Sequence, residues 1–153
     1  MVDIALKALS PGTNDPTTAV TCINYLAAVL VQMASRRFPA PERALDGTVR
    51  LITRDADFAT MLDEAFTEIR QSASSNARVL VRAVGALEFI AGVARSPKRR
   101  EALRTQLERF RETLQRLPAL PADRDPGIAA CNRLQGLLEQ PIAAAGQRRR
   151  SVT

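Results

Sequence analysis

Residues 10–36 read SPGTNDPTTAVTCINYLAAVLVQMASR, and this stretch decides the fold. Its first six residues break a preceding helix, because proline, glycine and asparagine favour turns. Asp15 then stands where a helix N-cap belongs, and Pro16 suits the first helical position. From Pro16 to Arg36 the apolar residues form two adjacent stripes beside a narrow polar strip. We therefore predict a long helix that is central in the fold and covered on most sides.

Helical periodicity continues through the rest of the chain, with apolar residues recurring at spacings of three and four. Short loops between such segments imply antiparallel neighbours. We predict an all-α fold: an antiparallel bundle of about five to six helices with one short extended segment near 48–53. Residues 1–145 form one helical domain, and 146–153 form a basic disordered tail. The expected helices cover 1–9, 16–36, 57–73, 76–95 and 97–117, and a last one opens at Asp125-Pro126 after a proline-rich linker.

Composition favours a globular domain, with 46% apolar and 25% charged residues. The most apolar stretch, 19–34, is interrupted by polar residues and is shorter than the roughly 20 residues of a membrane span, so we expect a buried core helix. The formal charge of +6 comes partly from two runs, 98–100 and 148–150. A nucleic-acid or acidic-lipid contact is one interpretation. Solvated helix surface is the other, and scarce aromatics at 4% make nucleic acid the less favoured partner.

The chain contains no histidine, which removes histidine-dependent nucleophiles, general bases and metal sites. No phosphate-binding loop, dinucleotide turn or calcium-loop pattern is present. We expect no cofactor, no metal and no catalytic residues, and hence a protein that is not an enzyme. Glu64 and Glu68 share one helix face, which is more often exposed surface than a cation site. Cys22 and Cys131 lie in apolar helical stretches and are expected to be buried.

The richest polar cluster is the loop from Ser10 to Thr18. Ser10, Gly12, Asn14, Asp15 and Thr18 surround the start of the long helix. Free amides at a helix start can hold an anion, and the asparagine and aspartate oxygens can instead hold a cation. A turn followed by an N-cap explains the same residue types without a ligand.

Two segments carry a family resemblance: DIALKALSPGTNDPTTA at 3–19 and AFTEIRQ at 65–71. They resemble the recurring blocks of a bacterial family of predicted integral membrane proteins, domain-of-unknown-function family 2254. The resemblance implies a helical domain that follows an N-terminal membrane region. This chain then corresponds to the C-terminal domain alone, from a shortened gene or a misplaced start, which agrees with the uncapped helix at 1–9.

The family has no established activity, so the resemblance supplies no catalytic residue. The positions that match the family are candidates for a shared ligand-binding site: Ser10, Pro11, Gly12, Asn14, Asp15, Pro16 and Arg70. Thr13 and Ser72 depart from the family's pattern, and both departures weaken the expectation that a family pocket is intact.

Three functional hypotheses follow. The first is a non-enzymatic interaction or regulatory module that contacts its own membrane region or a partner subunit, with homo-oligomers possible; it predicts an exposed apolar patch near 1–9. The second is a ligand- or ion-sensing module that uses the Ser10–Thr18 loop and Arg70. The third is weak nucleic-acid binding through the arginine-rich runs. The resemblance implies membrane association, with this chain alone expected to be soluble and cytoplasmic.

Overall fold

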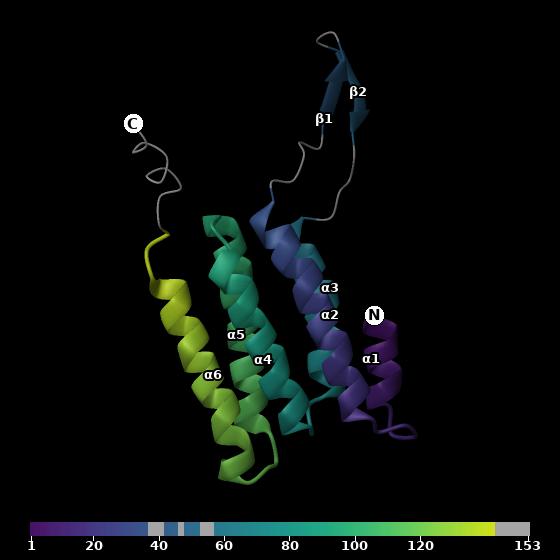
Figure 1. The fold of residues 1–153 in the computed structure, drawn as a ribbon, viewed down its shortest axis with the longest axis vertical. Coiled ribbons are helices and arrows are strands. Elements are labelled where there is room, and N and C mark those ends of the chain that lie inside the picture. Colours follow the sequence, from purple (N-terminus) through teal and green to yellow (C-terminus); the bar gives the residue numbers. More distant parts are fainter. Residues whose placement is uncertain (37–41, 46–47, 53–56, 143–153) are drawn as a thin grey trace, which may run out of the picture.

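The computed structural model describes residues 1–36, 42–45, 48–52 and 57–142. Within these ranges it contains six helices that pack together and one pair of strands (Figure 1). The elements in chain order are α1 (Val2–Leu9), α2 (Pro16–Ser35), β1 (Glu42–Leu45), β2 (Thr48–Ile52), α3 (Phe58–Ser72), α4 (Ala77–Val93), α5 (Pro97–Arg116) and α6 (Pro121–Glu139). The predicted all-α bundle is therefore confirmed.

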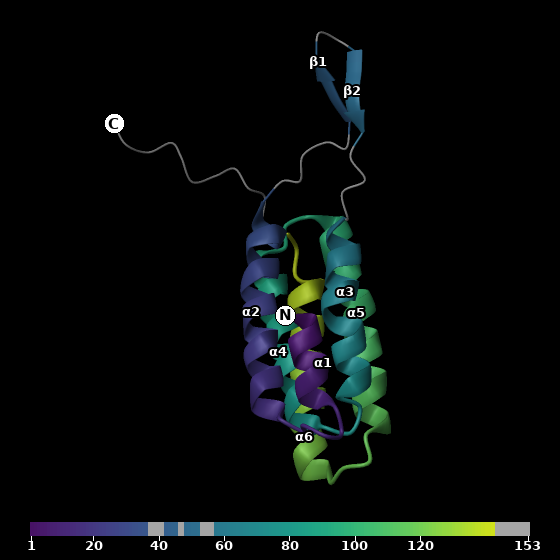
Figure 2. The same cartoon turned by 90° about the vertical axis from the view of Figure 1, so that its right-hand side faces the viewer.

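Four helices form the centre of the bundle. In Figure 1, α2 and α4 lie in front of α3 and α5, and Figure 2 shows the same two pairs side by side. The shorter α1 packs against α2 and α3, while α6 packs against α4 and α5 on the opposite side. Helices that follow one another in the chain run antiparallel. As a result α2, α4 and α6 all end at the same end of the bundle, where α5 begins.

The core is aliphatic, and α4 is its central helix. Eight of its residues are buried, and it packs against α2, α5 and α6. Phe66 of α3 and Phe110 of α5 meet edge to face, with ring centroids 6.2 Å apart. Fully burying a leucine or phenylalanine side chain contributes about 1.5–3 kcal/mol. Most of the large side chains that are fully buried belong to α3, α4 and α5, so these helices carry most of the hydrophobic stabilisation.

The expectation that the helix beginning at Pro16 is central and covered on most sides is wrong. One face of α2 is buried, including Ile23 and Leu30, but Tyr25 and Val29 on its other face are each 57% exposed. Apolarity on two stripes predicted burial of both. The bundle covers most of one stripe but only part of the other, in which Ala19 and Cys22 are buried and Val29 is exposed.

Five of the described helices begin within one residue of the predicted starts, and the last does not. Asp57 accepts a hydrogen bond from the Thr60 amide at 2.9 Å, and Asn76 caps α4 in the same way. The last helix begins at Pro121, not at Asp125, so the expected proline-rich linker is partly helical. Pro126 lies inside α6 and leaves the Ala122 carbonyl without its helical donor. Ala122 is exposed in the first turn, so water can satisfy that carbonyl.

The two strands form an antiparallel hairpin between α2 and α3, drawn beyond the end of the bundle in Figure 1. The extended segment expected near 48–53 is confirmed over Thr48–Ile52, and residue 53 lies outside the described residues. The partner strand was not predicted. Its signal was the Asp46-Gly47 pair, which is typical of a two-residue hairpin connection. A bulge separates the pairs Arg43–Leu51 and Ala44–Val49.

Close helix contact occurs at a glycine that the sequence reasoning overlooked. Gly85 and Gly92 of α4 are not such positions, because a Cβ at either would have no atom within 4 Å. At Gly127 of α6 a Cβ would lie 2.6 Å from the Cδ2 of Leu114 and 3.3 Å from Val81. The absent side chain of Gly127 is therefore what lets α6 pack against α4 and α5.

Candidate functional site

The Ser10–Thr18 loop is a capping corner between α1 and α2. One Asp15 carboxylate oxygen accepts hydrogen bonds from the amides of Thr17 and Thr18 at 3.0 and 3.1 Å. The other accepts the Thr18 hydroxyl at 2.5 Å. The Thr18 hydroxyl, followed by the Thr18 amide, lowers the pKa of Asp15 below its ordinary value of 3.8. The carboxylate is thus ionised at neutral pH and bound to the helix that it caps.

Ser10 makes further local hydrogen bonds in this loop. The Ser10 hydroxyl donates to the Lys7 carbonyl at 2.7 Å, and the amides of Thr13 and Asn14 both donate to the Ser10 carbonyl. Asn14 has a left-handed backbone (φ 42°), a conformation that asparagine tolerates. Gly12 is exposed, and its Cβ position is open. The loop geometry is that of a turn plus an N-cap, and a ligand role for its residues stays a prediction.

Arg70 was grouped with this loop, but its hydrogen bond goes elsewhere. One terminal nitrogen of its guanidinium donates to the Thr113 hydroxyl of α5 at 3.0 Å. Within the described ranges, no hydrogen bond or ion pair joins Arg70 to residues 10–18. Thr113 in turn donates to the Arg109 carbonyl at 2.9 Å. Arg70 therefore belongs to the surface between α3 and α5.

A cleft of about 530 Å³ lies at this place. The C-terminal turns of α3 and α5 form its walls, and the α3–α4 turn closes one end. Arg116 and Glu112 on one wall form an ion pair at 2.6 Å, and both side chains are exposed. The full lining is Arg70, Gln71, Ser74, Ser75, Glu112, Thr113, Arg116 and Pro118.

A second hollow, of about 370 Å³, lies over α4 between α2 and α6. Polar bridges cross it on both sides: Arg82 of α4 donates to Asn24 of α2, and Arg133 of α6 donates to Glu88 of α4 at 3.0 Å. The basic partner of Glu88 is Arg133, because α6 packs beside α4 at this level.

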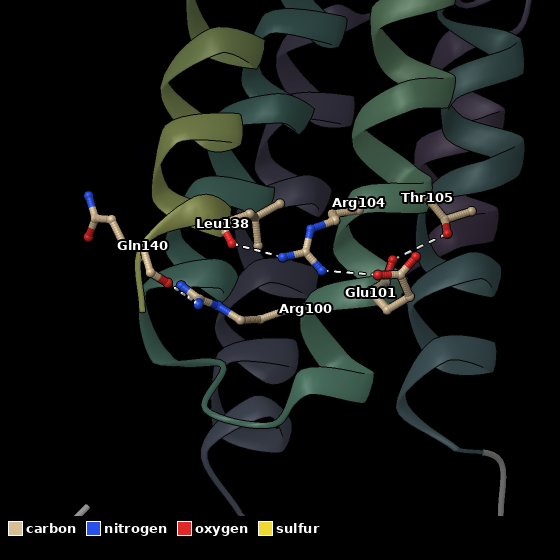
Figure 3. Close-up of polar contacts among 6 residues, drawn as sticks. All are labelled: Arg100, Glu101, Arg104, Thr105, Leu138 and Gln140. Atoms are coloured by element: carbon tan, nitrogen blue, oxygen red, sulfur yellow. Dashed lines mark hydrogen bonds and ion pairs between the residues drawn. The ribbon is translucent and has the colours of Figure 1, made fainter. Parts of the chain in front are cut away.

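Two arginines of the basic run at 98–100 donate hydrogen bonds to carbonyls at the ends of neighbouring helices. Arg99 donates to the carbonyls of Ala34 and Arg36 at the end of α2, at 2.7 and 2.5 Å. Arg100 donates to the Leu137 carbonyl at 2.7 Å, near the end of α6. It also donates to the Gln140 carbonyl at 2.5 Å (Figure 3).

Arg104, one turn further along α5, adds a bond to the Leu138 carbonyl at 3.0 Å and pairs with Glu101 (Figure 3). Carbonyls in a last helical turn have no helical donor, and a cation there also opposes the helix dipole. These arginines are therefore C-caps supplied by another helix.

A polar network also joins α3 to α5. Asp63 accepts hydrogen bonds from Arg109 and from the buried Gln106, the latter at 2.9 Å. Burial raises the pKa of Asp63, but the hydrogen bond and the charge of Arg109 outweigh it and hold the pKa below its ordinary value. This network fixes the register of two core helices.

The acidic and thiol groups show no metal-site geometry. Glu64 and Glu68 are exposed, as expected for a helix surface. Among the residues that the structure describes, no three His, Cys, Asp or Glu side chains gather closely enough to hold a metal ion. Cys22 and Cys131 are buried and unpaired, and burial raises the pKa of the Cys131 thiol to about 11.

One described helix, α2, has the length and apolarity to cross a membrane, with a mean hydropathy of 1.4. One third of its most apolar window (33%) is buried inside the bundle. A core helix of a soluble protein meets the same criterion, and α2 packs against α1 and α4.

Comparison with known proteins agrees with the resemblance in the sequence. Residues 1–88 match the family described as "Predicted membrane protein (DUF2254)". The chain is 35% identical over 142 residues to uncharacterized proteins of Mycobacterium bovis and Mycobacterium tuberculosis. The aligned region covers 92% of this chain but 27% of those proteins, so the chain spans about a quarter of the length of these relatives. No solved structure matches it.

Proposed function

The chain belongs to the DUF2254 family of predicted membrane proteins, and from this we propose that it is a non-enzymatic interaction domain. In this proposal it contacts the membrane-embedded part of its own longer protein, or a partner subunit, through exposed apolar helix surface. The domain itself lies outside the bilayer, on the cytoplasmic side.

The outward face of α2 carries the proposal. No Asp, Glu, Lys or Arg occurs between Pro16 and Ser35. Tyr25, Ala28 and Val29 are nevertheless exposed on this helix. A solvated helix face usually carries charge, as α5 does with its arginines and glutamates. The exposed residues of α2 also include the polar Thr21, Asn24 and Gln32. The proposal therefore rests on the exposed apolar side chains, which are typical of a protein interaction site when they form a patch.

The neighbouring α1 also exposes apolar side chains. Met1 and Ile4 are 53% and 52% exposed, which fits the apolar patch expected near 1–9. We call the exposed apolar residues of α2 and of the α1 segment, Met1 included, the α1–α2 face. It consists of Met1, Ile4, Tyr25, Ala28 and Val29.

A membrane-embedded helix is a suitable occupant for such a face. The relatives are several times longer than this chain, and the family consists of predicted membrane proteins. Membrane helices present few charges, because charge in the bilayer is costly. Two uncharged surfaces can meet without leaving an unpaired charge buried between them.

The test places a charge on the α1–α2 face. Val29→Arg changes an exposed position, so the fold should persist. Gln115→Arg adds the same charge at an exposed position of α5 and is the matched control. The isolated chain should bind a hydrophobic dye or self-associate in sedimentation, and Val29→Arg alone should reduce either signal. A monomer that binds no dye, or equal behaviour of the two variants, would refute the proposal.

A second experiment addresses the occupant. In a full-length family member, cysteine at the position aligned with Val29 should form crosslinks with the membrane region. Cysteine at the position aligned with Gln115 should not. Crosslinks to soluble proteins alone would exclude the membrane region as the occupant.

The two alternative functions have less support in the geometry. Nucleic-acid binding through 98–100 competes with the capping bonds of Arg99 and Arg100. Sensing by the Ser10–Thr18 loop would compete with the local hydrogen bonds that Ser10, Asp15 and Thr18 already make. The residues 148–150 lie outside the described part of the chain.

A further inference from the structure

The cleft between the C-terminal turns of α3 and α5 points to a binding site for a phosphate-like oxyanion, and we infer that Arg70 is its principal ligand. This site is separate from the α1–α2 face and from the Ser10–Thr18 loop. Its volume of about 530 Å³ lies within the range of small-molecule pockets.

The first reason is the charge of Arg70. Its guanidinium is half-buried and lines the cleft. Its hydrogen-bond partner is the neutral hydroxyl of Thr113. No carboxylate lies within ion-pair distance of Arg70 in the described ranges, whereas Arg104, Arg109, Arg111, Arg116 and Arg133 all have one. A half-buried cation without a counter-ion is stabilised by an anionic ligand.

The second reason is the set of donors around the same space. The hydroxyls of Ser74 and Ser75 line the cleft, and neither makes a hydrogen bond within the described residues. Arg116 is held by Glu112 in an exposed pair, which is worth little in water and can open toward an anion. With Arg70, Arg116 and Glu112 together, the cleft has a net charge of +1. Two guanidinium groups and two hydroxyls are the donor types that bind phosphate oxygens.

The test is a titration with inorganic phosphate at constant ionic strength, followed by amide NMR shifts of residues 74–77 and by melting temperature. Saturable shifts confined to the cleft are expected in the native chain, with a Kd in the millimolar range or tighter. Arg70→Gln should weaken binding about tenfold, the equivalent of roughly 1.4 kcal/mol. Arg116→Gln should weaken it several-fold.

The control is Arg95→Gln, which removes the same charge from an exposed residue just beyond the far end of α4. It should bind phosphate like the native chain. If Arg70→Gln fails to fold, the titrations of Arg116→Gln and of the native chain still test whether the cleft binds phosphate. Absence of saturable shifts at roughly 10 mM phosphate, or an equal loss in Arg95→Gln, would overturn the inference.

A second arm identifies the source of the phosphate group. Vesicles of phosphatidylglycerol and phosphatidylcholine are added to the native chain and to Arg70→Gln. Vesicle binding that needs Arg70 and is displaced by free phosphate assigns the cleft to a lipid headgroup. Phosphate binding without vesicle binding assigns it to a soluble phosphorylated compound.

Discussion

Replacing Arg100 with alanine should destabilise the bundle by about 2–3 kcal/mol. The side chain is 8% exposed and donates two hydrogen bonds to carbonyls at the end of α6. A hydrogen bond to a charged group contributes roughly 1.5–3 kcal/mol, and a cation at a helix C-terminus up to about 2 kcal/mol. The buried Nε makes no hydrogen bond in the described ranges, which offsets part of that sum.

Urea denaturation followed by circular dichroism measures this change directly. At roughly 2–4 °C per kcal/mol for a protein of this size, the melting temperature should fall by about 4–12 °C. Arg100→Lys keeps the charge but not both hydrogen bonds. Its melting temperature should therefore lie between those of the native protein and of Arg100→Ala. Lys98→Ala, an exposed neighbour, is the control. If Arg100→Ala costs less than about 0.5 kcal/mol, or no more than the control, then α5 does not cap α6.

Gly85→Ala should stabilise the protein by about 0.5–1 kcal/mol in urea denaturation, because its Cβ meets no atom and alanine favours helix. Gly127→Ala should instead destabilise it by about 1–3 kcal/mol, because its Cβ enters a packed contact; stabilisation would refute that packing. The carboxylates of Asp15 and Asp57 have lowered pKa values in the folded state, so their stabilising effect is present above the ordinary value of 3.8 and is lost as pH falls below it. Asn at both positions should retain capping and flatten the acid dependence of the urea midpoint. An unchanged profile would show that these two carboxylates do not cause the acid dependence. The Cys131 thiol should resist a thiol reagent until the chain unfolds, because burial raises its pKa to about 11; rapid native labelling would contradict this.

The helices could be predicted because their signals are local. Asp15 before Pro16, and Asp57 and Asn76 at later starts, are caps that act on amides two or three residues away. The start at Pro121 was missed because Asp125-Pro126 has the same local pattern as a true cap. In the structure the chain is already helical when it reaches Pro126.

Relations between distant residues could not be predicted. Arg70 was singled out by the family blocks, but its partner Thr113 lies 43 residues away, so the sequence did not show which cleft it lines. The run at 98–100 shows positive charge but not its target, which depends on α2 and α6 ending beside the first turn of α5. The exposed face of α2 was missed for the same reason. Periodicity identifies apolar stripes but not which of them a neighbour covers.

The bonds from Arg99 to α2 also bear on truncation. A polypeptide that stops at residue 88, where the family match ends, would lack the donor for the carbonyls of Ala34 and Arg36. It would also leave Leu80 and Leu87 of α4 without the two helices that now cover them. Residues 1–88 are therefore not a self-sufficient folding unit, and excision should be made after α6.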